Sequence, residues 1–199
     1  MQRSIVVMFI LGFSFAVIPS CSQSSPVSWG DEKLAPEQIK EMLKKSHVLT
    51  GKDLSGLDLS GFNMENAILN KVKLRKANLR GANLTKANLN EADLIEADLS
   101  GAQLSWADLT QANLTGANLS QALLDHAWLN KADFRKANLT GVNMRKSFLI
   151  DALFRDTILV GANLNMADVR GADFTGADLS GVTMRNANNI DKTKGMKTP

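Results

Sequence analysis

A strict period of five residues runs through most of the chain. From Leu54 to Met184 every fifth residue is apolar, and it is usually leucine. The residue two positions earlier is most often alanine, as in Ala77 and Ala82, and the residue between the two is mostly Asn or Asp. The repeating unit is therefore A-(N/D)-L-x-x.

This period excludes both regular secondary structures. On an α-helix a step of five residues turns about 140°, so the leucines would scatter around the axis. On a flat strand an odd step changes the face at every repeat. A chain that bends once per repeat keeps every leucine inside, and the alanine two positions earlier then also points inward. The other three positions face outward.

A second period of 20 residues predicts how many sides each coil has. Glycine occupies the last position of every fourth repeat, except where Gln121 stands: Gly61, Gly81, Gly101, Gly141, Gly161 and Gly181. The spacing predicts a four-sided coil with these glycines stacked in one column, where a turn needs unusual dihedral angles or a close backbone approach.

The tandem A-(N/D)-L-x-x units of residues 51–188 resemble the pentapeptide-repeat family. The resemblance implies an all-β fold, a right-handed quadrilateral parallel β-helix known as the pentapeptide-repeat solenoid. It implies little about function, because the roles of the family are diverse. Its best-known members protect DNA gyrase by imitating DNA with an acidic rod.

Residues 1–20 are expected to form a signal peptide that is absent from the folded domain. Arg3 precedes an apolar run from Ile5 to Ile18. That run is shorter than the ~20 residues needed to span a bilayer, and its length suits the core of an export signal. We therefore expect an exported protein of the bacterial cell envelope.

Cys21 is the predicted lipidation site. The segment Ile18-Pro19-Ser20-Cys21 resembles the bacterial lipobox, although Pro19 departs from the usual small residue there. Ser20-Cys21-Ser22 also fits ordinary signal-peptidase cleavage, so a lipid-anchored and a free periplasmic protein both stay open. Cys21 is the only cysteine of the chain, which excludes an internal disulfide.

Three further segments complete the domain organisation. Residues 21–33 are rich in serine and are expected to form a flexible tether. Residues 34–50 are predicted to form a capping helix, over 36–45, and its lead-in to the first coil. Residues 189–199 are predicted to be a polar C-terminal tail and a poor cap for the other end.

Composition and charge set limits on the function. Of the 199 residues 44% are hydrophobic and 22% are charged, which is ordinary globular composition. The net charge of +3 is mild and predicts no nucleic-acid binding. Basic residues cluster at Lys71, Lys73, Arg75, Lys76 and Arg80, and again at Lys131, Arg135, Lys136, Arg145 and Lys146. These clusters are interpreted as solvated faces balanced by acidic residues; contact with anionic lipid or envelope polymer is the alternative.

Residues that could carry chemistry are sparse. The two histidines, His47 and His126, stand far apart, and no cluster has metal-ligand spacing. A phosphate-binding loop and a Gly-x-Ser-x-Gly elbow are also missing. The sequence therefore predicts a protein that is not an enzyme and needs no cofactor.

Breaks in the polar outward pattern predict a binding surface. Trp128 and Phe148 are one 20-residue period apart, as are Trp106 and His126, and Ile68 shares the side of Trp128. The predicted partner patch, round one corner of the solenoid, consists of Trp106, Leu123, Trp128, Phe148, Ile150, Leu153, Ile158 and Val160. Contiguous exposed apolar residues often mark interaction sites. Local packing of these side chains within the sheet is the alternative.

The function predicted from these features is a non-catalytic binding or scaffold module of the cell envelope. It would present its solenoid surface to a protein partner or to a second copy of itself. The alternative is a DNA-mimicking protein that protects a topoisomerase, which the export signal and the net basic charge disfavour.

Overall fold

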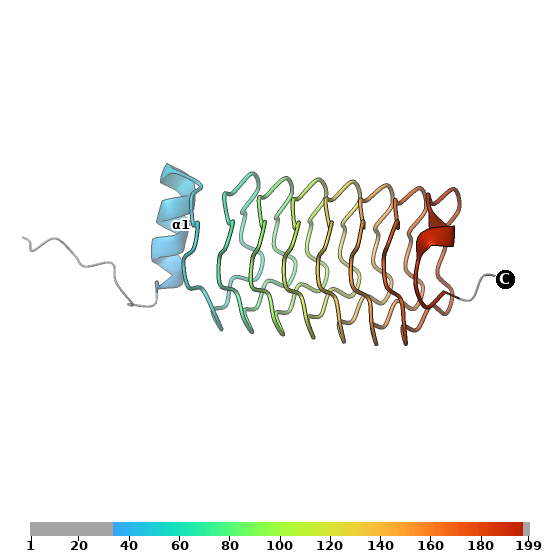
Figure 1. Cartoon of the computed structure of the whole chain (residues 1–199). Helices are drawn as coiled ribbons and strands as arrows, with labels where there is room; N and C mark the ends of the chain where they lie inside the picture. Colours follow the sequence, from blue (N-terminus) through green and yellow to red (C-terminus); the bar gives the residue numbers. More distant parts are fainter. Residues whose placement is uncertain (1–33, 197–199) are drawn as a thin grey trace, which may run out of the picture. The chain divides into compact units, whose positions relative to one another are not determined.

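The structure is a computed structural model that describes residues 34–196, which form a solenoid of stacked coils with a helix against its first coil (Figure 1). Helix α1 spans Pro36–Lys45, and a short 3-10 helix, η1, spans Ile190–Lys192 near the other end. Within the described residues the backbone pairs through isolated parallel bridges and not through longer strands. The predicted signal peptide, the lipidation site at Cys21 and the tether lie outside the described residues.

Every bridge joins two residues that are 20 positions apart, except the last, which joins Asp173 to Lys194. Asp53 pairs in parallel with Lys73, which pairs in turn with Asp93. The N–H of Leu54 donates to the carbonyl of Lys73 at 2.8 Å, and the N–H of Lys73 donates to the carbonyl of Lys52 at 2.9 Å. This register confirms a coil of four pentapeptides in which every coil bonds to both of its neighbours.

The central residue and the alanine of each unit fill the interior, as the period of five predicted. Leu54, Leu84 and Leu114 are completely buried. On one side of the later coils phenylalanine replaces leucine: Phe134, Phe154 and Phe174 stack with ring centroids 4.9 and 4.8 Å apart. Neighbouring coils cover each other's apolar residues, so burial depends on the stack.

A tight turn forms every corner between two sides of a coil. The N–H of Ala77 donates to the carbonyl of Leu74 at 3.1 Å, and the third residue of that turn, Lys76, has φ of 55°. A positive φ at this position is the requirement of a type II turn. The predicted glycine column has this geometry, with φ of 61° at Gly81.

Positive φ extends well beyond the glycine column. Every fifth residue from position 51 to position 186 adopts it, including charged and aromatic residues such as Lys76, Trp106 and His126. Residues other than glycine rarely adopt a positive φ. The stacked coils impose the same turn at all four corners, which the identity of the corner residues did not indicate.

The outward Asn or Asp of each unit stabilises the turn that follows it. Oδ1 of Asp58 accepts a hydrogen bond from the N–H of Ser60 at 3.0 Å, and Oδ1 of Asp108 accepts one from the N–H of Thr110 at 2.9 Å. Asn and Asp favour turns because their short side chains bond to the backbone two residues further on. This bond explains the N/D position of the repeat.

Helix α1 covers the first coil. Pro36 starts the helix, and the Gln38 side chain accepts a hydrogen bond from the N–H of Ala35 at 2.7 Å. Ile39 and Leu43 are buried and belong to the same apolar core as Leu49 of the first coil. The opposite face of the helix is charged.

At the other end the bridges continue beyond residue 188, the predicted end of the solenoid. Lys194 pairs with Asp173, and Ile190 and Met196 pack partly buried against the core. The last central residues, Leu179 and Met184, stay only half-buried. This end is therefore less well covered than the end under α1.

Candidate functional site

The 20-residue register assigns each outward residue to one of four faces. Trp128 pairs with Asp108 on one side and with Phe148 on the other. Val48 and Ile68 lie on the same face, because the bridges link them to this column. Leu123 lies on the preceding face of the coil, where it pairs with Gln103 and Asn143.

The corner between these two faces contains a pair of stacked rings. The rings of Trp106 and His126 lie 4.1 Å apart between centroids, with an interplanar angle of 7°. Trp106 is 53% exposed and Trp128 is 50% exposed. We call Trp106, Leu123, His126, Trp128 and Phe148 the aromatic corner. It joins two exposed aromatic residues on one face, Trp128 and Phe148, to the stacked pair on the adjoining turn.

The other members of the predicted patch lie elsewhere. Leu153 lies on the face after that of Phe148, between Asp133 and Asp173, and Ile158 lies on the next face, between Asn138 and Asp178. Ile150 and Val160 are half-buried turn residues of these later corners. Because consecutive outward positions point in successive directions round the coil, the eight residues do not share one corner, and the candidate site is confined to the aromatic corner.

The column of Trp106 and His126 contains further residues that were not part of the predicted patch. Met166, which is exposed, lies in the same corner column as Trp106 and His126, and Nη2 of Arg145 contacts its sulfur at 3.5 Å. Lys86 and Lys146 occupy that column on either side of the stacked rings. The 20-residue spacing from Trp106 is enough to assign Lys86, Lys146 and Met166 to this column, since 86, 146 and 166 fall on that period.

The apolar residues of the aromatic corner give up a stabilising bond. Leu123, Trp128 and Phe148 occupy the position where Asn or Asp would accept the hydrogen bond of the next turn. After Phe148 the N–H of Ile150 donates to Oδ1 of Asn130 on the neighbouring coil, at 3.2 Å. A typical hydrogen bond contributes about 1 kcal/mol. The apolar residues of the aromatic corner therefore make the local turns less stable than Asn or Asp would.

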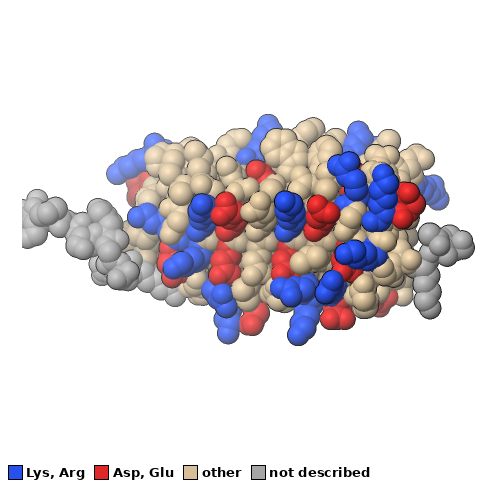
Figure 2. All heavy atoms as spheres, in the orientation of Figure 1, with Lys and Arg blue, Asp and Glu red and all other residues tan. Residues whose placement is uncertain are grey.

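The first basic cluster is balanced by acidic residues on neighbouring coils. Lysine and arginine alternate with aspartate and glutamate across the surface (Figure 2). Ion pairs join Lys71 to Glu91 at 3.5 Å, Arg75 to Asp93 at 3.0 Å, Lys76 to Glu96 at 3.4 Å and Arg80 to Asp98 at 3.5 Å. Exposed pairs contribute roughly 0–1 kcal/mol each. These contacts favour the interpretation of the first cluster as a solvated face.

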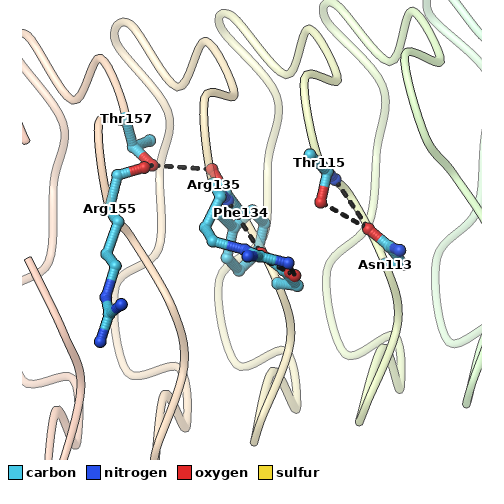
Figure 3. A network of polar contacts seen from close by, with 7 residues as sticks. Asn113, Thr115, Phe134, Arg135, Arg155 and Thr157 are labelled. Carbon is cyan, nitrogen blue, oxygen red and sulfur yellow. Dashed lines mark hydrogen bonds and ion pairs between the residues drawn. The ribbon is translucent and has the colours of Figure 1, made fainter.

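A polar network on another part of the solenoid is structural. The buried hydroxyl of Thr157 donates to the carbonyl of Phe134 at 2.7 Å, and Arg135 contacts Asp133 at 2.6 Å (Figure 3). Hydrogen bonds from Thr175 and from Arg155 lower the pKa of the buried Asp173 to about 2, although burial opposes the shift. Asp173 is thus ionised at neutral pH and acts as an acceptor.

Across residues 34–196 no three His, Cys, Asp or Glu side chains gather in a way that could hold a metal ion. The helices described there are too short or too polar to cross a bilayer. His126 is engaged in its stack with Trp106, and His47 lies in the turn after α1.

The chain belongs to the pentapeptide-repeat family. It matches the family described as "Pentapeptide repeats (8 copies)" over residues 49–85, 77–116, 117–156 and 152–188, which together make up well over half of its length. No curated protein matches it. The members of this family are right-handed quadrilateral β-helices and generally serve as non-catalytic structural or binding proteins.

Solved structures of pentapeptide-repeat proteins are similar to this chain. A protein from the thylakoid lumen of Arabidopsis thaliana is 39% identical, with 49% of this chain and 65% of that chain covered and a TM-score of 0.40. HetL, involved in heterocyst differentiation regulation in the cyanobacterium Nostoc sp. strain PCC 7120, is 26% identical, with 78% and 94% covered and a TM-score of 0.38. QnrB1, a plasmid-mediated fluoroquinolone resistance protein, is 17% identical, with 74% and 88% covered and a TM-score of 0.52, and supports the fold alone.

Proposed function

We propose that this protein is a non-catalytic scaffold of the cell envelope that holds a protein partner on its aromatic corner. The observation that carries the proposal is the exposure of Trp106, Trp128 and Phe148 beside one another on a solenoid whose outward positions are otherwise mostly polar. Large aromatic side chains are the residues that most often anchor protein interfaces. Their presence where Asn or Asp would stabilise the turn favours a role in binding over a role in folding.

The surroundings of the corner indicate the chemistry of the partner. Lys86 and Lys146 lie on either side of the stacked rings, and Arg145 is next to Lys146. Complementary charge fixes the orientation of partners and excludes competitors. The partner that fits best is a protein segment with an apolar centre and acidic residues on both flanks.

The N-terminal sequence supports a location in the envelope. The apolar run of residues 5–18 and the lipobox-like segment before Cys21 support export, followed either by lipid anchoring or by release into the periplasm. The intact mass of the mature N-terminus, taken with membrane fractionation, distinguishes these routes. An acylated Cys21 makes the protein an anchored lipoprotein, whereas a cut after Ser22 with soluble protein makes it free.

The test of the aromatic corner is the double variant Trp128→Asn and Phe148→Asn. Asparagine restores the residue type of the repeat, so we expect unchanged or slightly higher stability together with loss of partner binding. The readout is chemical cross-linking in intact cells, followed by affinity purification through the scaffold. Light scattering of the purified proteins shows whether the lost partner is a second copy of the chain.

The matched control is Leu153→Asn with Ile158→Asn, the same exchange on the two faces away from the aromatic corner. We expect this control to keep the cross-linked partner. If the corner variant keeps the partner as well, the aromatic corner is not the binding surface.

The alternative function is a DNA mimic that protects a topoisomerase. QnrB1 is a fluoroquinolone resistance protein and has the same fold. A DNA-like surface is continuously acidic, whereas here cations and anions alternate along neighbouring coils (Figure 2). The charge pattern therefore favours the scaffold. Relief of gyrase inhibition by the purified protein would reverse this preference.

A further inference from the structure

A cleft of about 510 Å³ lies between helix α1 and the first coils of the solenoid. One wall comes from α1 and the turn after it. The other wall comes from one corner of the first coil and the residues beside it. The lining residues are Lys40, Leu43, Lys44, His47, Ser60, Gly61, Phe62 and Asn63. A volume of this size is typical of small-molecule sites.

Every ionisable residue that lines the cleft is basic. Lys40 and Lys44 each contact one glutamate on the exposed side of α1, Glu37 and Glu41, at 2.9 Å. An ammonium group has three N–H donors, so each lysine keeps donors beyond its single glutamate contact. The two lysines are therefore able to bind an additional anion.

The opposite wall supplies neutral donors and an apolar surface. Oδ1 of Asn63 accepts from the N–H of Glu65 and from Nδ2 of Asn83, which leaves the Nδ2 donor of Asn63 for a ligand. The ring of Phe62 lies under Nζ of Lys40, 5.1 Å from the ring centroid. Phe62 and Leu43 pack against the core and give the cleft its apolar part.

We infer that this cleft binds a phosphate group that carries an apolar substituent. Two ammonium groups, an imidazole, a hydroxyl and an amide provide charge-assisted and neutral hydrogen bonds to phosphate oxygens. Leu43 and Phe62 provide the contact for the substituent. The headgroup of an anionic phospholipid and a soluble phosphate ester share this chemistry.

The position of the cleft favours the lipid as the source. The cleft lies at the α1 end of the solenoid, and α1 is the first described element after the predicted lipid anchor at Cys21. The inference itself does not depend on anchoring or on the aromatic corner. On the solenoid corners Lys71 pairs with Glu91 of the next coil, whereas the glutamates that contact Lys40 and Lys44 belong to α1 itself.

The test is calorimetric titration of the full-length protein with two probes. One probe is inorganic phosphate, and the other is dihexanoyl phosphatidylglycerol kept below the concentration at which it forms micelles. We expect saturable binding that weakens by about tenfold or more in Lys40→Gln with Lys44→Gln, because two charge-assisted hydrogen bonds are lost. Both lysines are exposed, so melting curves should match those of the unmodified protein.

The matched control is Lys131→Gln with Lys136→Gln, which removes the same charge from corner positions elsewhere on the solenoid. Binding of the lipid alone assigns the site to a headgroup, and binding of phosphate with equal or higher affinity assigns it to a soluble ester. The inference is overturned if neither probe binds saturably, or if both double variants weaken binding equally.

Discussion

At the scale of single residues, the residue type at each corner position determines how much backbone strain the turn carries. Gly81 has φ of 61°, and a Cβ added there would meet no atom within 4 Å. Any effect of a substitution at this site therefore comes from the backbone conformation and not from crowding. Other corners adopt the same φ with Lys, Trp or His and carry the strain of a left-handed residue.

We expect Gly81→Val to lower the free energy of unfolding by about 1–2 kcal/mol, because a β-branched residue is strongly disfavoured at positive φ. Gly81→Asn is the control, since asparagine tolerates this conformation. It should lower the free energy of unfolding clearly less than valine does. Urea unfolding followed by circular dichroism measures both. Equal losses would mean that the backbone conformation is not the cause.

Asp173 makes the stability of the solenoid depend on pH in the acid range. Its pKa is lowered to about 2 in the folded protein by hydrogen bonds from Thr175 and Arg155. An unfolded aspartate titrates near pH 3.9, so the stabilisation is complete above that pH. It is lost as the pH falls from about 4 to about 2, and it amounts to roughly 2 kcal/mol.

This dependence is measured by urea unfolding at a series of pH values between neutral and 2. Asp173→Asn lacks the titrating group, so its stability should fall less steeply in that window. Parallel curves for the two proteins would show that other carboxylates cause the acid sensitivity.

At the scale of elements, the phenylalanine stack consists of the largest fully buried side chains of the core. Phe154 lies between Phe134 and Phe174, with its ring nearly parallel to both. We expect Phe154→Ala to lower the free energy of unfolding by about 3–5 kcal/mol, because it removes a buried ring and leaves a cavity. Chemical denaturation of the purified variant measures this loss.

Phe154→Leu is the control for that prediction. It restores the residue that most other repeats carry at this position, so the remaining side chain fills much of the space. The loss should be smaller than for alanine. If leucine and alanine cost the same, the stacking geometry itself would be more important than the buried volume.

At the scale of the whole described unit, the two ends of the solenoid differ in their cover. Ile39 of α1 is fully buried over the first coil, whereas Leu179 and Met184 of the last coil are half-buried. In a solenoid each coil is stabilised mainly by its neighbours, so a coil with poor cover on one side opens first.

We therefore expect backbone amides of residues 177–187 to exchange hydrogen faster than those of residues 49–65, as measured by mass spectrometry of peptides. Ile39→Ser weakens the cover of α1 and should raise exchange in residues 49–65 without changing the other end. Uniform protection along the chain would instead indicate that all coils open in a single cooperative step.

The sequence by itself determined the inward Leu and Ala positions through the five-residue pattern and the 20-residue coil through the spacing of the glycines. It also indicated helix α1 through the local pattern of residues 36–45, because each of these features is stated within a repeat or a short segment. Only the tertiary structure decided which outward residues share a surface. Stacking kept the two pairs that the 20-residue period predicted, Trp106 with His126 and Trp128 with Phe148, on one corner. It separated Leu153 and Ile158 onto other faces. The same stacking set positive φ at every corner and formed the cleft under α1. These features depend on contacts between residues about 20 positions apart, which the composition of any one repeat does not contain.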